Sequence, residues 1–241
     1  AIAYLEAENA YTDAMMKAAA PFQEALYQEM LGRIKQTDLT VPYRLRGHYY
    51  YSRTEEGKQY PIQCRKQGSL EAPEEVLLDL NDLATGHKFL GLGAFAVSDD
   101  GDRLAFSLDT TGFRQYTMHV KDLTTGQWGP ERVDKIGSIV WAADDATLFY
   151  TVEDAAKRQY RLYRHRLGGP PAGDELLYEE KDERFSIAAR RSLSKAYIFL
   201  TSSSHTASEV RYLAADRPDG AFQLVAAREQ EHEYYVDPHG D

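Results

Sequence analysis

The spacing of apolar residues divides the chain into two parts. In residues 1–36 the spacing is helical, and Pro21 splits this segment at a place where it suits the first turn of a second helix, because its missing N–H costs nothing there. After Pro21, apolar side chains recur every four residues, at Phe22, Leu26, Met30 and Ile34. We therefore predict an N-terminal helical extension over residues 1–37, whose narrow apolar stripe packs on a neighbouring domain.

From Leu45 onward the pattern changes to short strands separated by turns, after a linker over residues 37–42. Three tyrosines at 49–51 favour a strand, because aromatic side chains pack well on a pleated surface. Residues 54–58 then predict a turn, and residues 59–65 a second strand with Tyr60, Ile62 and Cys64 on one face. This stretch predicts a β-hairpin.

The hairpin pattern recurs along the chain. Residues 94–109 align with residues 138–154: a short apolar strand leads through an acidic turn into a second apolar strand. In the first copy the turn is Asp99-Asp100-Gly101, where glycine supplies the positive φ that a tight hairpin needs. A weaker copy covers residues 186–215, and Tyr116 and Tyr160 occupy matching positions after the first two.

Each copy is followed by one more expected strand, and these strands lie near residues 76–80, 128–133, 175–178 and 222–225. Four strands repeated about every 45 to 55 residues are typical of β-propeller blades. The predicted fold is mainly β: an incomplete, roughly four-bladed antiparallel β-propeller over residues 43–241. The expected blades are residues 45–83, 89–133, 137–180 and 185–227, with a fifth begun at Glu233. Residues 168–173 are expected to form a flexible outer loop.

Composition limits the possible partners. The chain has 241 residues, with 28 basic and 38 acidic side chains and a net charge of −10, which disfavours nucleic acid. Cys64 is the only cysteine, so neither an internal disulfide nor a cysteine-rich metal site is expected. No apolar run approaches the roughly 20 residues that a membrane helix needs. The first residues do not form a signal peptide, and without an initiator methionine the natural start is expected to be missing.

Several longer segments together resemble the oligopeptidase B branch of the prolyl oligopeptidase serine peptidases. The resemblance covers essentially the whole chain. Its most specific parts are Arg-Ile-Lys at residues 33–35, Tyr-Tyr-Tyr-Ser-Arg at residues 49–53 and Tyr-Pro-Ile at residues 60–62. The segments LGAFAVSDDGDRLAFSLD, GSIVWAADDATLFYTVED and YRHRLG show the same likeness.

The resemblance implies an N-terminal helical extension, a seven-bladed propeller and a C-terminal α/β-hydrolase domain with a Ser, Asp, His triad. The propeller of this family limits access, so that short peptides are cleaved and folded proteins are spared. The oligopeptidase B branch cuts after Lys and Arg, and its members are expected in the cytoplasm. The implied partners are therefore the missing hydrolase domain and short basic peptides.

The chain departs from the family pattern because it contains no G-x-S-x-G nucleophile elbow and no surrounding α/β alternation. No triad residue can be assigned. We therefore expect an inactive N-terminal piece of a peptidase, in which open blade edges favour self-association. No catalytic, cofactor-binding or metal-binding residue is predicted.

Seven sets of residues invite a functional interpretation, and each has a simpler one. Ser202, Ser203, Ser204 and His205 are adjacent, so their side chains point apart and predict a polar loop rather than a nucleophile and base. Cys64 is interpreted as a small buried strand residue. The aromatic residues Phe95 and Trp141 are expected between blades, and residues 91–95, GLGAF, lack the pattern of a phosphate loop.

The charged candidates are interpreted in the same way. Asp99, Asp100 and Asp102 lack the spacing of a calcium loop and predict a hairpin turn. The C-terminal trio of His232, Asp237 and His239 lacks tetrahedral ligand spacing and is expected to be exposed. A basic set surrounds Tyr160 and Tyr163. Strand alternation should place Tyr163 and His165 on one face and Arg164 and Arg166 on the other, solvated or paired with acids such as Glu179, Glu180 and Asp182. The basic residues are Arg158, Arg161, Arg164 and Arg166.

Two hypotheses of different classes remain. The first is the non-catalytic propeller part of a Lys/Arg-specific serine oligopeptidase. The second is a free-standing, propeller-like module that binds peptides or proteins and never had a catalytic partner. A stop codon directly after Asp241 in the natural gene would favour the second hypothesis, whereas a downstream G-x-S-x-G would favour the first.

Overall fold

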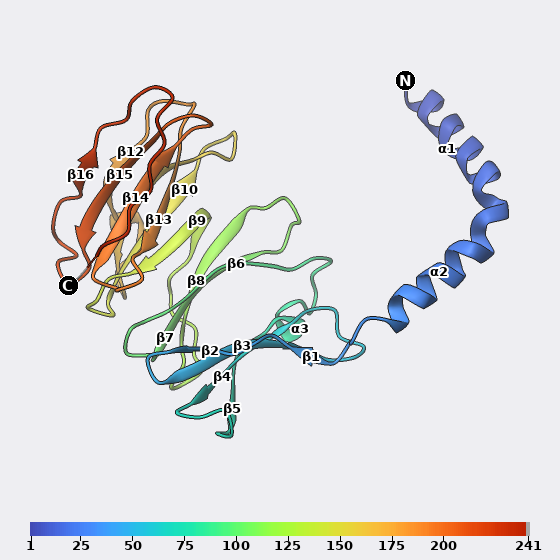
Figure 1. Cartoon of the computed structure of the whole chain (residues 1–241), viewed down its shortest axis with the longest axis horizontal. Coiled ribbons are helices and arrows are strands. Elements are labelled where there is room, and N and C mark those ends of the chain that lie inside the picture. Colours follow the sequence, from blue (N-terminus) through green and yellow to red (C-terminus); the bar gives the residue numbers. More distant parts are fainter. Residues whose placement is uncertain (240–241) are drawn as a thin grey trace.

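The computed structural model describes residues 1–239 and shows a helical arm joined to a β-sheet body (Figure 1). The arm consists of α1 (Ile2–Met16), a 3₁₀ turn (Lys17–Ala19) and α2 (Ala20–Gly32). Pro21 lies in the first turn of α2, as its fixed φ favours. None of the residues in α1 or α2 is buried, and in Figure 1 the arm extends away from the sheets. The apolar stripe of α2 therefore has no partner among residues 1–239.

The first sheet contains the tyrosine-rich hairpin. Its strands are β1 (Asp38–Leu39), β2 (Tyr43–Leu45), β3 (His48–Thr54), β4 (Ile62–Gln67) and β5 (Glu74–Asp79), followed by the short helix α3 (Leu80–Leu83). β1 and β2 both pair with β3, so together they form the innermost edge of this blade.

The second sheet holds two blades that share one long strand. Its strands are β6 (Gly91–Val97), β7 (Arg103–Asp109), β8 (Tyr116–Asp122), β9 (Val133–Trp141), β10 (Thr147–Glu153), β11 (Gln159–Arg166) and β12 (Glu175–Glu179). The first part of β9 pairs with β8, and its second part pairs with β10. β9 is therefore the outer strand of the second blade and continues as the inner strand of the third.

The third sheet is the fourth blade. It runs in the order β13 (Ser186–Arg191), β14 (Tyr197–Ser203), β15 (Ser208–Ala214) and β16 (Gln223–Ala226). All of its neighbouring strands are antiparallel. The prediction of a mainly β, antiparallel propeller after a helical extension is confirmed.

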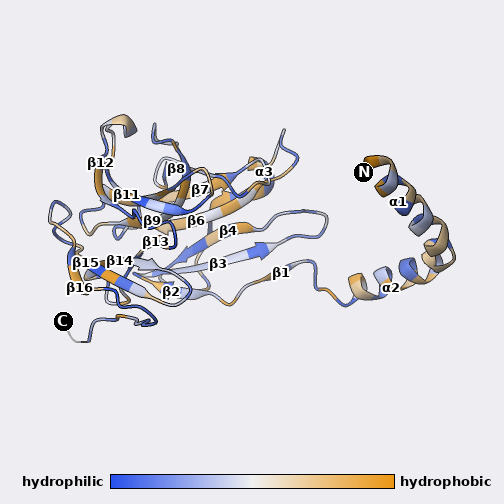
Figure 2. Ribbon diagram, turned by 90° about the horizontal axis from the view of Figure 1, so that it is seen from above, coloured by the Kyte–Doolittle hydropathy of each residue, from blue (hydrophilic) through white to orange (hydrophobic). Residues whose placement is uncertain are grey.

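Three apolar cores lie between successive blades rather than within them. Between the first and second blades, Tyr50 and Leu77 pack with Phe106. Between the third and fourth, Phe149 and Leu200 belong to one buried cluster. Figure 2 shows apolar residues on many of these strands and along the arm. Because each blade has two apolar faces, the blades are stabilised by stacking side by side.

Local features differ from the sequence predictions in four places. The predicted linker contains a strand, since Asp38 and Leu39 pair with Thr54 and Arg53. The second strand of the first hairpin begins at Ile62, and Tyr60 lies in the preceding loop against another core. The expected strand near residues 128–133 is reduced to a single bridge from Trp128, and strand pairing starts at Val133. In each case tertiary pairing decided the boundary.

The fourth difference concerns the end of the chain. Residues 233–239 form no strand, and the remaining two residues of the predicted fifth blade lie outside the described residues. Instead, the Tyr234 hydroxyl accepts a hydrogen bond from the Val210 N–H at 2.8 Å. The outer loop at residues 168–173 contains a 3₁₀ turn (Pro171–Gly173). Its first residue is held in place by a hydrogen bond of 2.9 Å from the Gly168 N–H to Glu131.

Candidate binding surfaces

The inner strands of the four blades line an open cavity of about 480 Å³, called here the inner cavity. Its walls are mainly apolar and aromatic, with Tyr43 and Tyr50 from the first blade, Phe95 from the second and Trp141 from the third. Tyr43 stacks on Tyr50, with ring centroids 5.6 Å apart. The expectation that Phe95 and Trp141 lie between blades is met: Trp141 is buried and donates its indole N–H to the Ala96 carbonyl at 2.8 Å.

One end of the inner cavity is bordered by four turns, called here the rim turns: residues 46–47, 98–102, 142–146 and 192–196. Each joins the first and second strands of one blade, so all four lie at the same end of the propeller. Residues of all four turns line a shallow depression at this end. The arm leaves from the other end, because β1 pairs with the Thr54 end of β3.

Asp99 connects three blades at the rim. Its carboxylate lies 2.9 Å from the Arg46 guanidinium and 2.8 Å from that of Arg191. Arg191 also donates to the Trp141 carbonyl at 3.2 Å and to the Lys195 carbonyl at 2.9 Å. The predicted hairpin turn is present, with Gly101 at φ 84°. Asp99 therefore pairs with two arginines, an environment unsuited to a calcium ligand.

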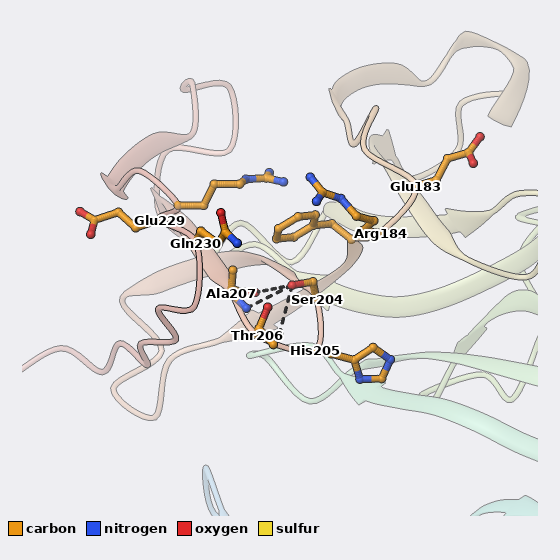
Figure 3. A pocket seen from close by; sticks show the side chains of 10 residues that line it. Glu183, Arg184, Ser204, His205, Thr206, Ala207, Glu229 and Gln230 are labelled. Carbon is orange, nitrogen blue, oxygen red and sulfur yellow. Dashed lines mark hydrogen bonds between the residues drawn. The ribbon is translucent and has the colours of Figure 1, made fainter.

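A second cavity, of about 560 Å³, lies at the arm's end of the fourth blade (Figure 3). Beneath it, the Arg228 guanidinium stacks 4.0 Å above the Phe185 ring and bonds to Glu180 at 2.6 Å. Burial alone would raise the pKa of Glu180, but hydrogen bonds from Arg228, Ser202 and neighbouring groups outweigh it and lower that pKa. This network holds the crossover into the fourth blade and presents no free nucleophile.

The serine run at this cavity is not a catalytic pair. The Ser204 hydroxyl accepts the backbone N–H groups of Thr206 and Ala207 within its own turn. Figure 3 shows the exposed His205 ring extending away from Ser204. Ser202 instead donates to Glu180 at 2.6 Å. The loop interpretation is correct for Ser204 and His205, but it is wrong for Ser202 and Ser203, which are the last residues of β14 and pair with Glu209 and Ser208.

The basic residues near Tyr160 are engaged in contacts within the propeller. Arg158 donates to three carbonyls of the crossover at residues 180–185 and to Asp154. Arg161 pairs with Glu179 at 2.7 Å, and Arg164 pairs with Glu175. The predicted alternation holds, since Tyr163 stacks on Tyr150 and His165 is buried. These arginines hold strands and loops of the third blade together.

The remaining sequence candidates are dispersed. Cys64 is buried on β4, where burial and nearby Glu74 raise the pKa of its thiol to about 11. Residues 91–95 begin strand β6 rather than a phosphate loop. His232, Asp237 and His239 are exposed. Across residues 1–239, no three His, Cys, Asp or Glu side chains are grouped as metal ligands, and no helix is long and apolar enough to cross a membrane.

Sequence reasoning missed a buried polar cluster between the second and third blades. The fully buried His165 ring is 2.7 Å from Asp174 through Nδ1 and 4.0 Å from Glu131 through Nε2. The Tyr150 hydroxyl donates to Asp174 at 2.7 Å. A Cβ at position 129 would lie 2.1 Å from a carboxylate oxygen of Glu131, so the glycine at this position leaves room for that side chain. The strand alternation placed His165 inward, but nothing in the sequence identified its partners, which come from two separate loops.

Residues 1–241, which form the propeller and its exposed arm, match the family described as "Prolyl oligopeptidase, N-terminal beta-propeller domain". The chain belongs to the prolyl oligopeptidase family. This confirms the membership predicted from the sequence, and the chain is the N-terminal propeller part of a peptidase of that family.

Relatives in this family are much longer than the chain. Dipeptidyl aminopeptidase BI from Pseudoxanthomonas mexicana is 40% identical over 257 residues, covering 100% of this chain and 35% of the relative. Protease 2 from Moraxella lacunata is 38% identical, covering 94% of this chain and 34% of the relative. The solved oligopeptidase B of Leishmania major superposes with a TM-score of 0.91 at 30% identity, over 99% of this chain and 34% of that protein. The chain thus spans about a third of the length of these relatives.

Proposed function

We propose that the chain is the substrate-limiting propeller and docking arm of an oligopeptidase B-like serine peptidase that cleaves short peptides after Lys or Arg. The observation that carries the proposal is the unpartnered arm. A cytoplasmic location, expected from the family resemblance, is part of the same proposal and is tested by cell fractionation.

The arm has the physical character of a docking element. On α2 the exposed fractions are 69% for Phe22, 40% for Leu26 and 52% for Met30, and Ile34 just beyond it is 62% exposed. Leaving several large apolar side chains in water is unfavourable, because burial stabilises each by roughly 1.5–3 kcal/mol. A contiguous exposed apolar surface of this kind marks an interaction site. The proposed partner is the α/β-hydrolase domain of the same enzyme.

The position of the arm agrees with this role. It leaves the propeller at the end opposite the rim turns, so a domain held by the arm would cover that end of the inner cavity. A peptide in the cavity would then be enclosed between the propeller and the hydrolase domain. Such an enclosure admits short peptides and excludes folded proteins by size.

The proposal is tested by expressing the chain together with the polypeptide encoded directly downstream of Asp241 in its gene. The two should co-purify and together hydrolyse a fluorogenic Arg-Arg peptide, whereas the chain alone should show no turnover above background. The double change Leu26→Glu and Met30→Glu should abolish co-purification while leaving the exposed arm helical. Glu24→Gln, off the apolar stripe, is the matched control.

Two results would contradict the proposal. One is a stop codon after Asp241, which would favour the hypothesis of a free-standing interaction module. The other is turnover by the purified chain alone that persists through repeated purification.

A further inference from the structure

We propose that the rim end of the inner cavity binds the free α-carboxylate of a peptide through the ammonium group of Lys195, with Arg191 beside it. This inference rests on the proposed role of the propeller in enclosing peptides and adds a feature that the enclosed peptide must carry. It assigns a ligand group to residues at the end of the cavity away from the arm.

The inner cavity has the size and lining of a ligand site. Its volume of about 480 Å³ falls within the roughly 300–1,000 Å³ typical of such sites. Phe95, Ile139 and Trp141 form part of its apolar wall. Arg191 and Lys195 line the inner cavity and also the rim depression, so they stand where the two meet. A ligand that fits this arrangement has an apolar body and an anionic end.

The cations at this junction outnumber the carboxylate that pairs with them. Asp99 is shared between Arg46 and Arg191, as described above. Among the described residues, no carboxylate oxygen lies within 4.0 Å of the Lys195 ammonium group. Lys195 is half-buried, and burial followed by the charge of Arg191 lowers the pKa of its amine, against a smaller opposing effect of the Asp99 carboxylate. A partly desolvated cation beside other cations is stabilised by binding an anion.

Other acidic groups at the rim are already engaged. Asp100 accepts a hydrogen bond from Ser98 at 2.5 Å and lies 3.4 Å from the Arg103 guanidinium. Asp145 accepts the Asp99 backbone N–H at 2.5 Å, and burial raises the pKa of its carboxyl group. Neither carboxylate is within ion-pair distance of Lys195 in the described chain. The position of Lys195 is therefore open to an external carboxylate.

The α-carboxylate of a peptide matches these features. It carries a full charge at neutral pH, and the C-terminal residue that bears it also has a side chain that can lie on the aromatic wall of the cavity. An internal segment of a longer polypeptide has no such charge. Recognition of a chain end would add a chemical preference for short peptides to the size limit that the enclosure imposes.

The test measures binding of acetyl-Ala-Ala-Phe with a free carboxylate and of the same peptide as its C-terminal amide, by titration calorimetry with the full chain. The acid should bind, and the amide should bind at least about tenfold more weakly, because a hydrogen bond to a charged group contributes about 1.5–3 kcal/mol. Lys195→Met should weaken binding of the acid to the level of the amide. Lys88→Met, an exposed lysine before β6, is the matched control and should leave it unchanged.

Several outcomes would overturn the assignment. They are equal binding of acid and amide by the wild-type chain, undiminished binding of the acid by Lys195→Met, or equally tight binding of an amidated peptide whose only carboxylate is an aspartate side chain. If Lys195→Met does not fold, the comparison of acid with amide still decides the question. Because no hydrolysis is measured, a failure here would leave the docking role of the arm untouched.

Discussion

Removing the charge of Asp99 should lower the free energy of unfolding by weakening the contact between three blades at the rim turns, without altering the shape of the turn. Asp99→Asn keeps the size of the side chain and one carbonyl oxygen, but it removes the charge that faces Arg46 and Arg191. The Arg191 guanidinium would keep its bonds to two backbone carbonyls and lose its only described carboxylate partner within 4.0 Å. The change therefore isolates the ionic part of the contact.

The expected cost follows from the burial of each pair. The side chains of Asp99 and Arg191 are 14% and 9% exposed, so their contact belongs with hydrogen bonds to charged groups, at about 1.5–3 kcal/mol. The Arg46 side chain is 38% exposed, and solvent screening reduces its share to about 0–1 kcal/mol. Since asparagine retains part of the hydrogen bonding, we expect a loss of about 2 kcal/mol in the free energy of unfolding.

The assay is urea unfolding followed by circular dichroism, with the midpoint compared at unchanged slope. Asp102→Asn is the control, because Asp102 lies in the same turn, is exposed and has no side-chain ion pair among the described residues. A double-mutant cycle with Arg191→Met should give a coupling energy of about 1–2 kcal/mol. Equal midpoints for the Asp99 and Asp102 variants, or no coupling to Arg191, would refute the three-blade connection.

Three further predictions concern association, packing and pH. The purified chain should self-associate through its open blade edges, and a clean monomer at high concentration in light scattering would count against this. Gly93→Ala should destabilise the second blade by about 1–3 kcal/mol, because the new Cβ would lie 2.7 Å from the Tyr116 ring. Gly173→Ala is the control and should leave stability unchanged, because open space surrounds Gly173; equal thermal midpoints for the two variants would disprove the packing argument. The free energy of unfolding should fall as the pH drops from about 5 through the lowered pKa of Glu180, since a carboxylate with a depressed pKa stabilises the fold only while it is ionised. Glu180→Gln should flatten this part of the pH profile, and a variant profile parallel to that of the unmodified chain would exclude Glu180 as the cause.

Local sequence pattern predicted where several polar side chains lie on their strands and turns. It did not predict which groups they contact. The sequence placed His165 on the inner face of its strand, because side chains alternate along β structure, and the buried ring agrees. It could not name Asp174 or Glu131 as the groups around that ring, since both come from loops whose positions depend on packed blades. In the same way, Asp99 was correctly assigned to a turn, but its two arginines were not foreseen.

The sequence by itself determined the repeat of four-stranded units, the acidic turn at Gly101, the helical arm with its apolar stripe and the family, because each of these is written in short-range spacing and residue type. Only the tertiary structure decided that β9 serves two blades, that the arm has no partner within the described chain, and that Lys195 stands beside Arg191 at the end of the inner cavity. The physical reason is that these features depend on how whole blades stack. Stacking brings together side chains far apart in sequence, as with Arg46 and Asp99, which are 53 residues apart.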